Sequence, residues 1–287
     1  MNWEEKLSKF LDDFAYKDDV VGVLVCGSYI TGNPSNHSDL DVHIILRDDV
    51  DYRERGNKIV DGLLIEYFSN PAKQVREYFK NDYKRFRTMS FVQFITGKIF
   101  LDKTGIVKEL KEEAKTYFDK HFSDLDSSID ALSIYGMWDM LDDLKDGFEN
   151  NREDFDLIYY CNLDKLLTLY MKFIKYPYNT KSILGNITSE IVRKKYLLDE
   201  LPDKEISELI KNCIILPSRE ERMNNYEKLT NKILDLCGGF DIDNFKYKSP
   251  VDISQIVFKS FITLFLKDLF CYNRQIWSVL LYVFRLL

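Results

Sequence analysis

Two short segments, residues 20–26 and 40–46, constrain the fold of this chain more than any other feature. The first is an apolar, β-branched run, which is typical of a buried strand, and the second is also predicted to be a strand. Between them lies a loop that contains glycine, asparagine and proline. Gly27 and Ser28 end the first segment, and Asp39 and Asp41 flank the first residue of the second. We therefore expect a sheet with polar groups at its strand ends.

Further elements are predicted on both sides of this pair. A helix with one apolar face is expected over 3–14, strands near 58–60, 63–68 and 99–101, and a helix from Pro71 to about 83. Asp61-Gly62 predicts a two-residue hairpin. Helical patterns then dominate, at 106–120, 127–149, 156–175, 187–199, 203–213, 218–236 and 253–285. The fold class is accordingly α/β (α+β): a small mixed-sheet domain, 1–115, followed by an all-α domain, 116–287.

Composition narrows the functional classes. The 287 residues suggest two domains, and a net charge of −7 argues against a long nucleic acid as partner. The five cysteines form no CxxC pair, so buried reduced thiols are expected rather than a zinc site or disulfides.

No signal peptide is recognised, which favours the cytoplasm. Charged residues interrupt the apolar stretch 258–287, so a buried terminal helix is expected, with interfacial membrane contact as the alternative. Oligomeric state is not readable.

The acidic pair Asp39 and Asp41 is the first candidate site. Side chains alternate along a strand, so the two carboxylates share a face, while Val42 and Ile44 point to the opposite, apolar face. Two carboxylates so placed repel each other unless cations lie between them. Magnesium prefers oxygen ligands from one or two carboxylates together with substrate phosphates. The pair therefore predicts a magnesium site.

Glu66 is the third acidic candidate, because it interrupts an otherwise apolar strand where an unpartnered carboxylate is costly to bury. If this strand neighbours the one that starts at Asp39, a three-carboxylate cluster results. Such a cluster can hold two divalent ions. At the preceding turn, Gly27 lets the backbone approach a ligand closely, and the hydroxyl of Ser28 can contact a phosphate.

These motifs together resemble the signature of the DNA polymerase β-like nucleotidyltransferase superfamily. The resemblance covers roughly residues 20–70: Gly27-Ser28, then Asp39-x-Asp41 after ten intervening residues, then Glu66 between apolar neighbours. It implies that Asp39, Asp41 and Glu66 are catalytic and bind metal, and that Gly27 and Ser28 line the nucleotide phosphates. The order of domains is similar to that of bacterial nucleotidyltransferases that act on antibiotics such as aminoglycosides and lincosamides.

Other residues are weaker candidates. The superfamily often places a lysine of the helical region on the β- and γ-phosphates, and Lys181, which follows aromatic residues in a helix break, is assigned that role; the alternative is a surface lysine. His43 is expected to fill the edge of the cleft rather than to touch the metals, and His37 to be exposed. Acidic residues of the helix over 127–149 could face a cationic acceptor or form a solvated surface. Arg85 and Arg87 could contact phosphate or solvate a helix end.

The expected function is that of an enzyme that uses Mg²⁺, two ions per site. It would transfer a nucleoside monophosphate from a nucleoside triphosphate, with ATP expected, to a hydroxyl of an antibiotic-like small molecule. An alternative is a toxin-like enzyme that modifies an RNA end or a protein hydroxyl, for which a basic groove beside the carboxylates would be the sign. A non-catalytic nucleotide-binding module is the third possibility, and the intact acidic triad disfavours it.

Overall fold

The computed structural model describes residues 2–32, 34–179, 181–243 and 245–250. The chain divides into two compact units, 1–242 and 243–287, and every element described below lies in the first. The predicted terminal helix over 253–285 lies outside the described residues. The domain boundary predicted at 115/116 stays a prediction, and it falls inside a continuous helix, α5 (Ile106–Asp119).

A five-stranded mixed sheet forms the N-terminal part, as predicted. Its strands are β1 (Val20–Cys26), β2 (Leu40–Leu46), β3 (Glu54–Val60), β4 (Leu63–Pro71) and β5 (Lys98–Asp102), in the spatial order β3-β4-β2-β1-β5. β2 and β4 run parallel, and the other neighbouring pairs are antiparallel. The strand of the acidic pair therefore lies between the strand that ends at Gly27 and the strand that carries Glu66.

The hairpin predicted at Asp61-Gly62 is present, with Val60 paired to Leu63 and both turn residues at positive φ, 47° and 79°. Positive φ at both positions defines the type I′ turn. β3 extends beyond the strand predicted over 58–60. The sequence analysis missed its first residues because they are mostly polar and show no apolar alternation. This edge strand brings Arg55 beside β4.

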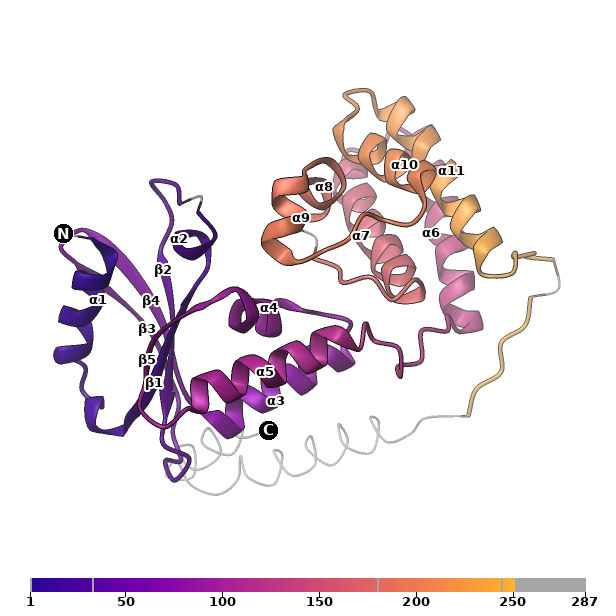
Figure 1. Ribbon diagram of the computed structural model, residues 1–287. Helices are drawn as coiled ribbons and strands as arrows, with labels where there is room; N and C mark the ends of the chain where they lie inside the picture. The colour runs from indigo at the N-terminus through magenta and orange to yellow at the C-terminus, as the bar shows by residue number, and fades with distance from the viewer. Residues whose placement is uncertain (1, 33, 180, 244, 251–287) are drawn as a thin grey trace, which may run out of the picture. The chain divides into compact units, whose positions relative to one another are not determined.

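Helices cover both faces of the sheet (Figure 1). α1 (Trp3–Asp12) packs on one face, where Leu7 and Phe10 join an apolar core with Val42 and Ile44. The other face is covered by α3 (Ala72–Lys84), α4 (Met89–Thr96) and α5, whose core includes Ile45 of β2. Because strand residues alternate, Asp41 belongs to this second face. The sequence analysis did not identify α4.

Two short elements connect the strands. A 3-10 turn, η1 (Lys17–Asp19), precedes β1, and α2 (Ser28–Thr31) directly follows Gly27. Gly32 ends α2 in the left-handed conformation, at φ 93°. The turn after β1 is thus a single helical turn held between two glycines, and its first residue is Ser28.

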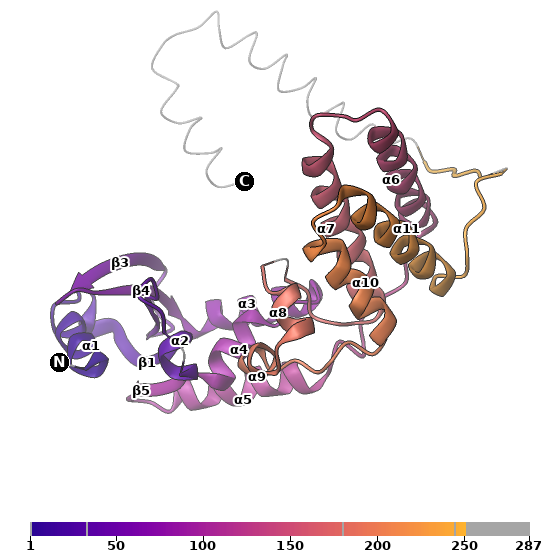
Figure 2. The same cartoon turned by 90° about the horizontal axis from the view of Figure 1, so that it is seen from above.

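The rest of the first unit is helical, as predicted (Figure 2). It contains α6 (Ala131–Glu149), α7 (Phe155–Phe173), α8 (Ile183–Thr188), α9 (Glu190–Tyr196), α10 (Lys204–Ile215) and α11 (Arg219–Leu236). Their shared core includes the buried rings of Tyr159, Tyr170 and Tyr226. The helix predicted over 187–199 is wrong in extent: α8 and α9 are separated at Ser189, whose side chain caps α9 by accepting from the Val192 N–H.

Two smaller expectations can also be compared with the structure. Cys26 and Cys213 are buried free thiols, but Cys161 is exposed on α7, so the expectation of buried cysteines is wrong there. Cys271 lies outside the described residues. Among the helices that the structure describes, none is long and apolar enough to cross a membrane.

Candidate active site

Three carboxylates from two neighbouring strands, β2 and β4, converge on one face of the sheet. Asp39, Asp41 and Glu66 each offer an oxygen, and these atoms all lie within 4.8 Å of one another. Asp41 is the direct register partner of Glu66 in the parallel β2–β4 pair, which puts both on the same face. Asp39 immediately precedes β2, two residues from Asp41, and is on that face as well. The predicted cluster is therefore present in the structure.

The cluster is electrostatically costly without a cation. All three residues are half buried. Burial raises the pKa of Asp41 to about 6, the negative charges of Asp39 and Glu66 add to that rise, and the positive charge of Lys195 opposes it. The fold thus holds Asp41 where its ionised form is disfavoured, and a positive ion at this point would relieve the penalty.

The donor set fits a hard divalent cation. All the converging ligand atoms are carboxylate oxygens, which Mg²⁺ and Mn²⁺ prefer over imidazole or thiolate. Within the described ranges, this is the only group of three or more His, Cys, Asp or Glu side chains close enough together to hold a metal. A magnesium site at Asp39, Asp41 and Glu66 is therefore compatible with both the geometry and the chemistry.

Arg55 of β3 pairs with Glu66, and the sequence analysis did not find it. Its Nη2 lies 2.6 Å from Glu66 Oε1, and its guanidinium lies 4.8 Å from the centre of the Phe68 ring. The Arg55 side chain is 68% exposed, while that of Glu66 is 19% exposed. Because the Arg55 side chain is largely exposed and lies on an edge strand, it is not part of the buried core, and a different orientation away from Glu66 would leave that core intact. No signal in the sequence placed it, because β3 lacks apolar alternation.

Gly27 is required by the position of Asp41. It adopts φ 75° and ψ −158°, a conformation for which L side chains are poorly suited. A Cβ atom at Gly27 would lie 2.0 Å from Asp41 Oδ2, well inside van der Waals contact. The turn and the acidic pair are therefore in direct contact, since Cys26 pairs with Asp41 across β1 and β2. Ser28, half buried, begins α2 beside this contact.

His43 lies further along β2 on the same face and is only 8% exposed. Its Nε2 is 3.3 Å from Gln93 Oε1 of α4, and its ring stacks on Phe68. Burial lowers the pKa of His43 to about 4, so the imidazole is neutral near pH 7. As expected, it fills the edge of the cleft and is not part of the acidic cluster. His37 is exposed in its loop.

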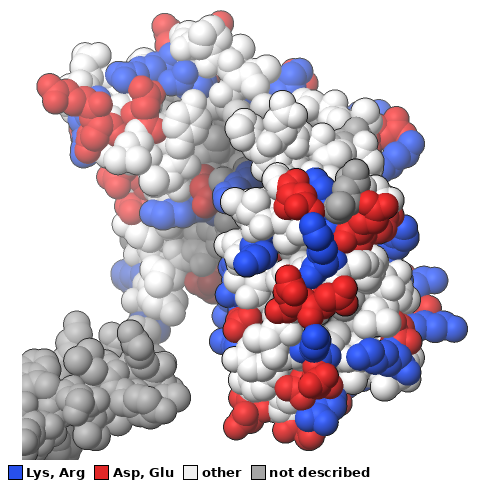
Figure 3. Space-filling model, turned by 90° about the vertical axis from the view of Figure 1, so that its left-hand side faces the viewer, with Lys and Arg blue, Asp and Glu red and all other residues white. Residues whose placement is uncertain are grey.

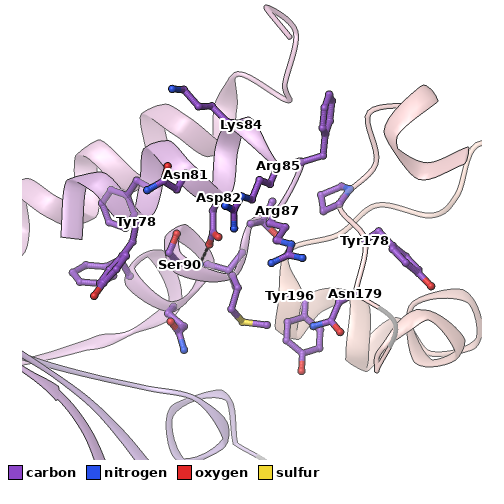
Figure 4. Close-up of a pocket in the computed structure, with 18 of the residues that line it drawn as sticks. Tyr78, Asn81, Asp82, Lys84, Arg85, Arg87, Ser90, Tyr178, Asn179 and Tyr196 are labelled. Atoms are coloured by element: carbon purple, nitrogen blue, oxygen red, sulfur yellow. Dashed lines mark hydrogen bonds between the residues drawn. The ribbon is translucent and has the colours of Figure 1, made fainter. Parts of the chain in front are cut away.

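A cavity of about 1440 Å³ opens beside the third carboxylate. Its walls include the Glu66 partner Arg55, together with Phe68 and His43, and further side chains come from α3, the α3–α4 loop, α4 and α7–α9 (Figure 4). The tyrosines Tyr78, Tyr176, Tyr178 and Tyr196 contribute aromatic surface. Neither Gly27 nor Ser28 lines this space, so it adjoins the β3–β4 side of the cluster rather than the glycine-serine turn.

The helical region contributes differently from what the sequence suggested. Lys181 is exposed and its backbone N–H donates to Asn179 Oδ1, but its side chain does not line the cavity. Lys195, in the last turn of α9, is the lysine whose charge acts on Asp41. In the sequence, Lys195 is one of three consecutive basic residues at the end of a helix, and this context does not indicate that its charge acts on Asp41. No residue of the acidic helix α6 lines the cavity.

The chain was compared with known protein families, curated proteins and solved structures. Residues 5–124 match the family model of the nucleotidyltransferase domain. No curated protein matches the chain. Among solved structures, a nucleotidyltransferase-like protein from Exiguobacterium sibiricum is similar, with 12% identity, a TM-score of 0.45, and coverage of 82% of this chain and 75% of that chain. The N-terminal part of this protein, with its mixed sheet and acidic triad, is a nucleotidyltransferase domain of the DNA polymerase β-like superfamily.

Proposed function

We propose that this protein transfers a nucleoside monophosphate from a magnesium-bound nucleoside triphosphate, with ATP as the expected donor, to a hydroxyl group of a small-molecule acceptor. The observation that carries the proposal is the convergence of Asp39, Asp41 and Glu66 next to the turn at Gly27. A solvated strand end would not bring together three half-buried carboxylates from two strands.

The reaction is a substitution at the α-phosphorus of the triphosphate. The oxygen of the acceptor hydroxyl forms a new bond to this phosphorus, and the bond between the α-phosphorus and the bridging oxygen to the β-phosphate breaks. Pyrophosphate leaves with that bonding pair. Glu66, the carboxylate next to the cavity, accepts the proton of the hydroxyl. The chain therefore mainly orients the two reactants and stabilises charge, as phosphoryl-type transfers require.

Asp39, Asp41 and Glu66 would hold the divalent ions, two per site. When bound, these ions would supply charge neutralisation for the triphosphate and pyrophosphate and would lower the pKa of the acceptor hydroxyl. The dependence on a divalent ion, the identity of Mg²⁺ and the number of ions are all part of the proposal.

Two regions are proposed to bind the triphosphate. The Gly27–Ser28 turn supplies the Ser28 hydroxyl and the free N–H groups at the start of α2, which suit a phosphate. A lysine of the helical region supplies a point charge. The sequence assigned that role to Lys181, but the charge of Lys195 acts on Asp41 and is therefore better placed. We propose Lys195 as the phosphate-binding lysine.

The test is transfer of label from α-³²P-labelled nucleoside triphosphates in the presence of Mg²⁺ and a panel of hydroxyl acceptors. We expect label to appear on an acceptor with wild-type protein and to disappear with EDTA or with Asp41→Asn. Undiminished transfer by Asp41→Asn would contradict the proposal. Saturable binding of the triphosphate with no transfer to any acceptor would instead favour a nucleotide-binding module.

A further inference from the structure

The cavity beside Glu66 has a charge opposite to that of the whole chain. Six basic side chains line it but only three acidic ones, Glu54, Asp82 and Asp164; the basic ones are Arg53, Arg55, Lys84, Arg85, Arg87 and Lys172. The complete chain, by contrast, carries −7. On the face of the molecule drawn in Figure 3, blue and red side chains are intermixed. Elsewhere in the described part of the chain, ion pairs such as Lys9–Asp61 bring opposite charges together. The positive charge of the cavity is thus a local feature.

Arg85 and Arg87 are held in a defined turn at the end of α3. The Arg87 N–H donates to the carbonyl of Asp82, and the Phe86 N–H donates to the carbonyl of Tyr83, which is the Schellman pattern of a helix end. Phe86 occupies the left-handed position at φ 55°, where glycine is usual, and its ring packs on Phe122. The turn is therefore anchored by an aromatic contact that positions the arginines on either side of it.

These two arginines have no acidic partner in the described part of the chain. Both are exposed, and neither forms an ion pair there. The nearby carboxylate of Asp82 instead accepts from the Ser90 N–H at the start of α4. Figure 4 shows Arg87 extending toward Tyr196 and Asn179 across the cavity. A pair of positioned, unneutralised guanidinium groups is well suited to a phosphate.

The position of the cavity indicates which reactant these arginines meet. The triphosphate is proposed to bind at the Gly27–Ser28 turn, which follows β1. The cavity is lined instead from β3 and β4, on the other side of β2 in the sheet. Glu66, which accepts the acceptor's proton, belongs to that same side. The basic cavity therefore serves the acceptor rather than the nucleoside triphosphate.

Two further features suit a polar ligand with a planar ring. Asn186 lines the cavity and is 2% exposed, and its Oδ1 has no hydrogen-bond partner among the described residues. Ser90 also lines the cavity, and its buried Oγ has no such partner either. Unpartnered buried polar atoms are rare and invite a ligand or water. The rings of Tyr78 and Tyr196 add surfaces on which a base can stack.

We propose that the acceptor is a phosphate-bearing molecule with an aromatic base, bound through Arg85 and Arg87, and not a cationic compound. This inference rests on the proposed transfer of a nucleoside monophosphate and specifies the acceptor: a free mononucleotide is a small-molecule acceptor, and an RNA end is the alternative acceptor of the sequence analysis. The shared chemistry is that of a nucleotide, which can be a free mononucleotide or the terminal nucleotide of an RNA. In both, a ribose hydroxyl is the attacking group, and the transfer is balanced as described above.

The test measures binding separately from transfer. The full chain is saturated with Mg²⁺ and a non-hydrolysable ATP analogue, so that the triphosphate site is occupied, and is titrated with fluorescently labelled AMP, a labelled eight-nucleotide RNA and a labelled aminoglycoside. We expect one of the two phosphate-bearing probes to bind. Arg85→Ala/Arg87→Ala should weaken that binding at least about tenfold, because each guanidinium–phosphate contact is charge-assisted. Arg85→Lys/Arg87→Lys should restore part of it.

A matched control removes the same charge elsewhere. Lys108 and Lys115 lie exposed on α5 and do not line the cavity. Lys108→Ala/Lys115→Ala should leave probe binding unchanged, and equal weakening by both double variants would overturn the inference. Tighter binding of the aminoglycoside, or no binding of either phosphate-bearing probe, would also overturn it. Asp41→Asn should abolish transfer but keep probe binding, so a failed inference and a failed function give different results. Preference for AMP or for RNA identifies the source of the phosphate.

Discussion

Two acidic regions of this protein behave differently, although both are conspicuous in the sequence. In the sheet, Asp39, Asp41 and Glu66 come from two strands, are half buried and converge within 4.8 Å. On α6, Asp142, Asp143 and Asp146 are all exposed and do not line the cavity. Within the described residues, only the first region brings three ligating groups together.

The difference shows that the number of acidic residues is a poor guide to a site. On α6, neighbouring carboxylates point into solvent, where water screens their repulsion and removes any need for a cation. On β2 and β4, the strand register holds the carboxylates close together. Burial, and then the negative charges of Asp39 and Glu66, raise the pKa of Asp41 to about 6. Convergence together with partial burial, rather than local density, distinguishes a metal site from a solvated surface.

The largest effect should follow from removing the charge of Asp41. We expect Asp41→Asn to lower kcat/KM by about 10³-fold or more, because a metal ligand acts on the transition state itself. The same chemical change on α6, Asp142→Asn/Asp143→Asn, should alter kcat/KM less than about twofold. Steady-state label transfer measures both. Comparable losses in the two variants would remove the distinction between the regions.

A smaller loss is expected from Gly27→Ala. The new Cβ would collide with Asp41 Oδ2 and displace the carboxylate. We expect a loss in kcat/KM of about 10- to 100-fold. Gly32→Ala is the matched control, since Gly32 also has positive φ, 93°, but nothing lies within 4 Å of its Cβ position. Gly32→Ala should keep most of the activity, and an equal loss of activity in both variants would show that backbone strain, not the contact with Asp41, is responsible.

Replacing the two candidate lysines should have different effects on the KM for the nucleoside triphosphate, by a factor of about ten. Lys195→Ala should raise the KM for the nucleoside triphosphate by about tenfold, because it removes a charge that acts on the acidic cluster. Lys181→Ala should change that KM little, since this side chain is exposed and its charge is not among those that act on Asp41. If Lys181→Ala has the larger effect, the sequence-based assignment of the phosphate-binding lysine is the correct one.

The smallest effect concerns stability without metal. The raised pKa of Asp41 means that the fold disfavours its ionised form, so at pH 7.5 in EDTA the neutral Asp41→Asn protein should be more stable than wild type. We expect a gain of about 1 kcal/mol, allowing for partial exposure, and a Tm higher by a few degrees. Added Mg²⁺ should raise the Tm of wild type only. Thermal unfolding followed by circular dichroism tests this, and a lower Tm for the variant would contradict the account.

Much of the site was predictable because it depends on local pattern. The sequence analysis predicted the two apolar segments before Gly27 and from Leu40, the Asp61-Gly62 hairpin and the three carboxylates. These features were predictable because strand alternation and turn type depend on residues that are adjacent in the sequence. That the Glu66 strand neighbours the Asp41 strand was a conditional expectation, and the structure confirms it; the parallel direction of the pair and its register are findings of the structure.

The remainder depends on contacts that local pattern does not encode. Arg55 reaches Glu66 only because β3 pairs in register with β4 at the sheet edge. Lys195 acts on Asp41 from a helix more than 150 residues away in sequence. The basic lining of the cavity likewise combines β3, the α3–α4 loop and α7, which explains why net charge and the acidic helix suggested a different acceptor.

Binding of Mn²⁺ measured by electron paramagnetic resonance tests most directly whether the sheet carboxylates form a cation site. We expect wild-type protein, in the presence of a nucleoside triphosphate analogue, to bind two ions per chain. Asp41→Asn and Glu66→Gln should each abolish at least one of them, while Asp142→Asn/Asp143→Asn should retain both. Unchanged Mn²⁺ binding in the two sheet variants, or its loss in the α6 variant, would contradict the assignment of the acidic triad.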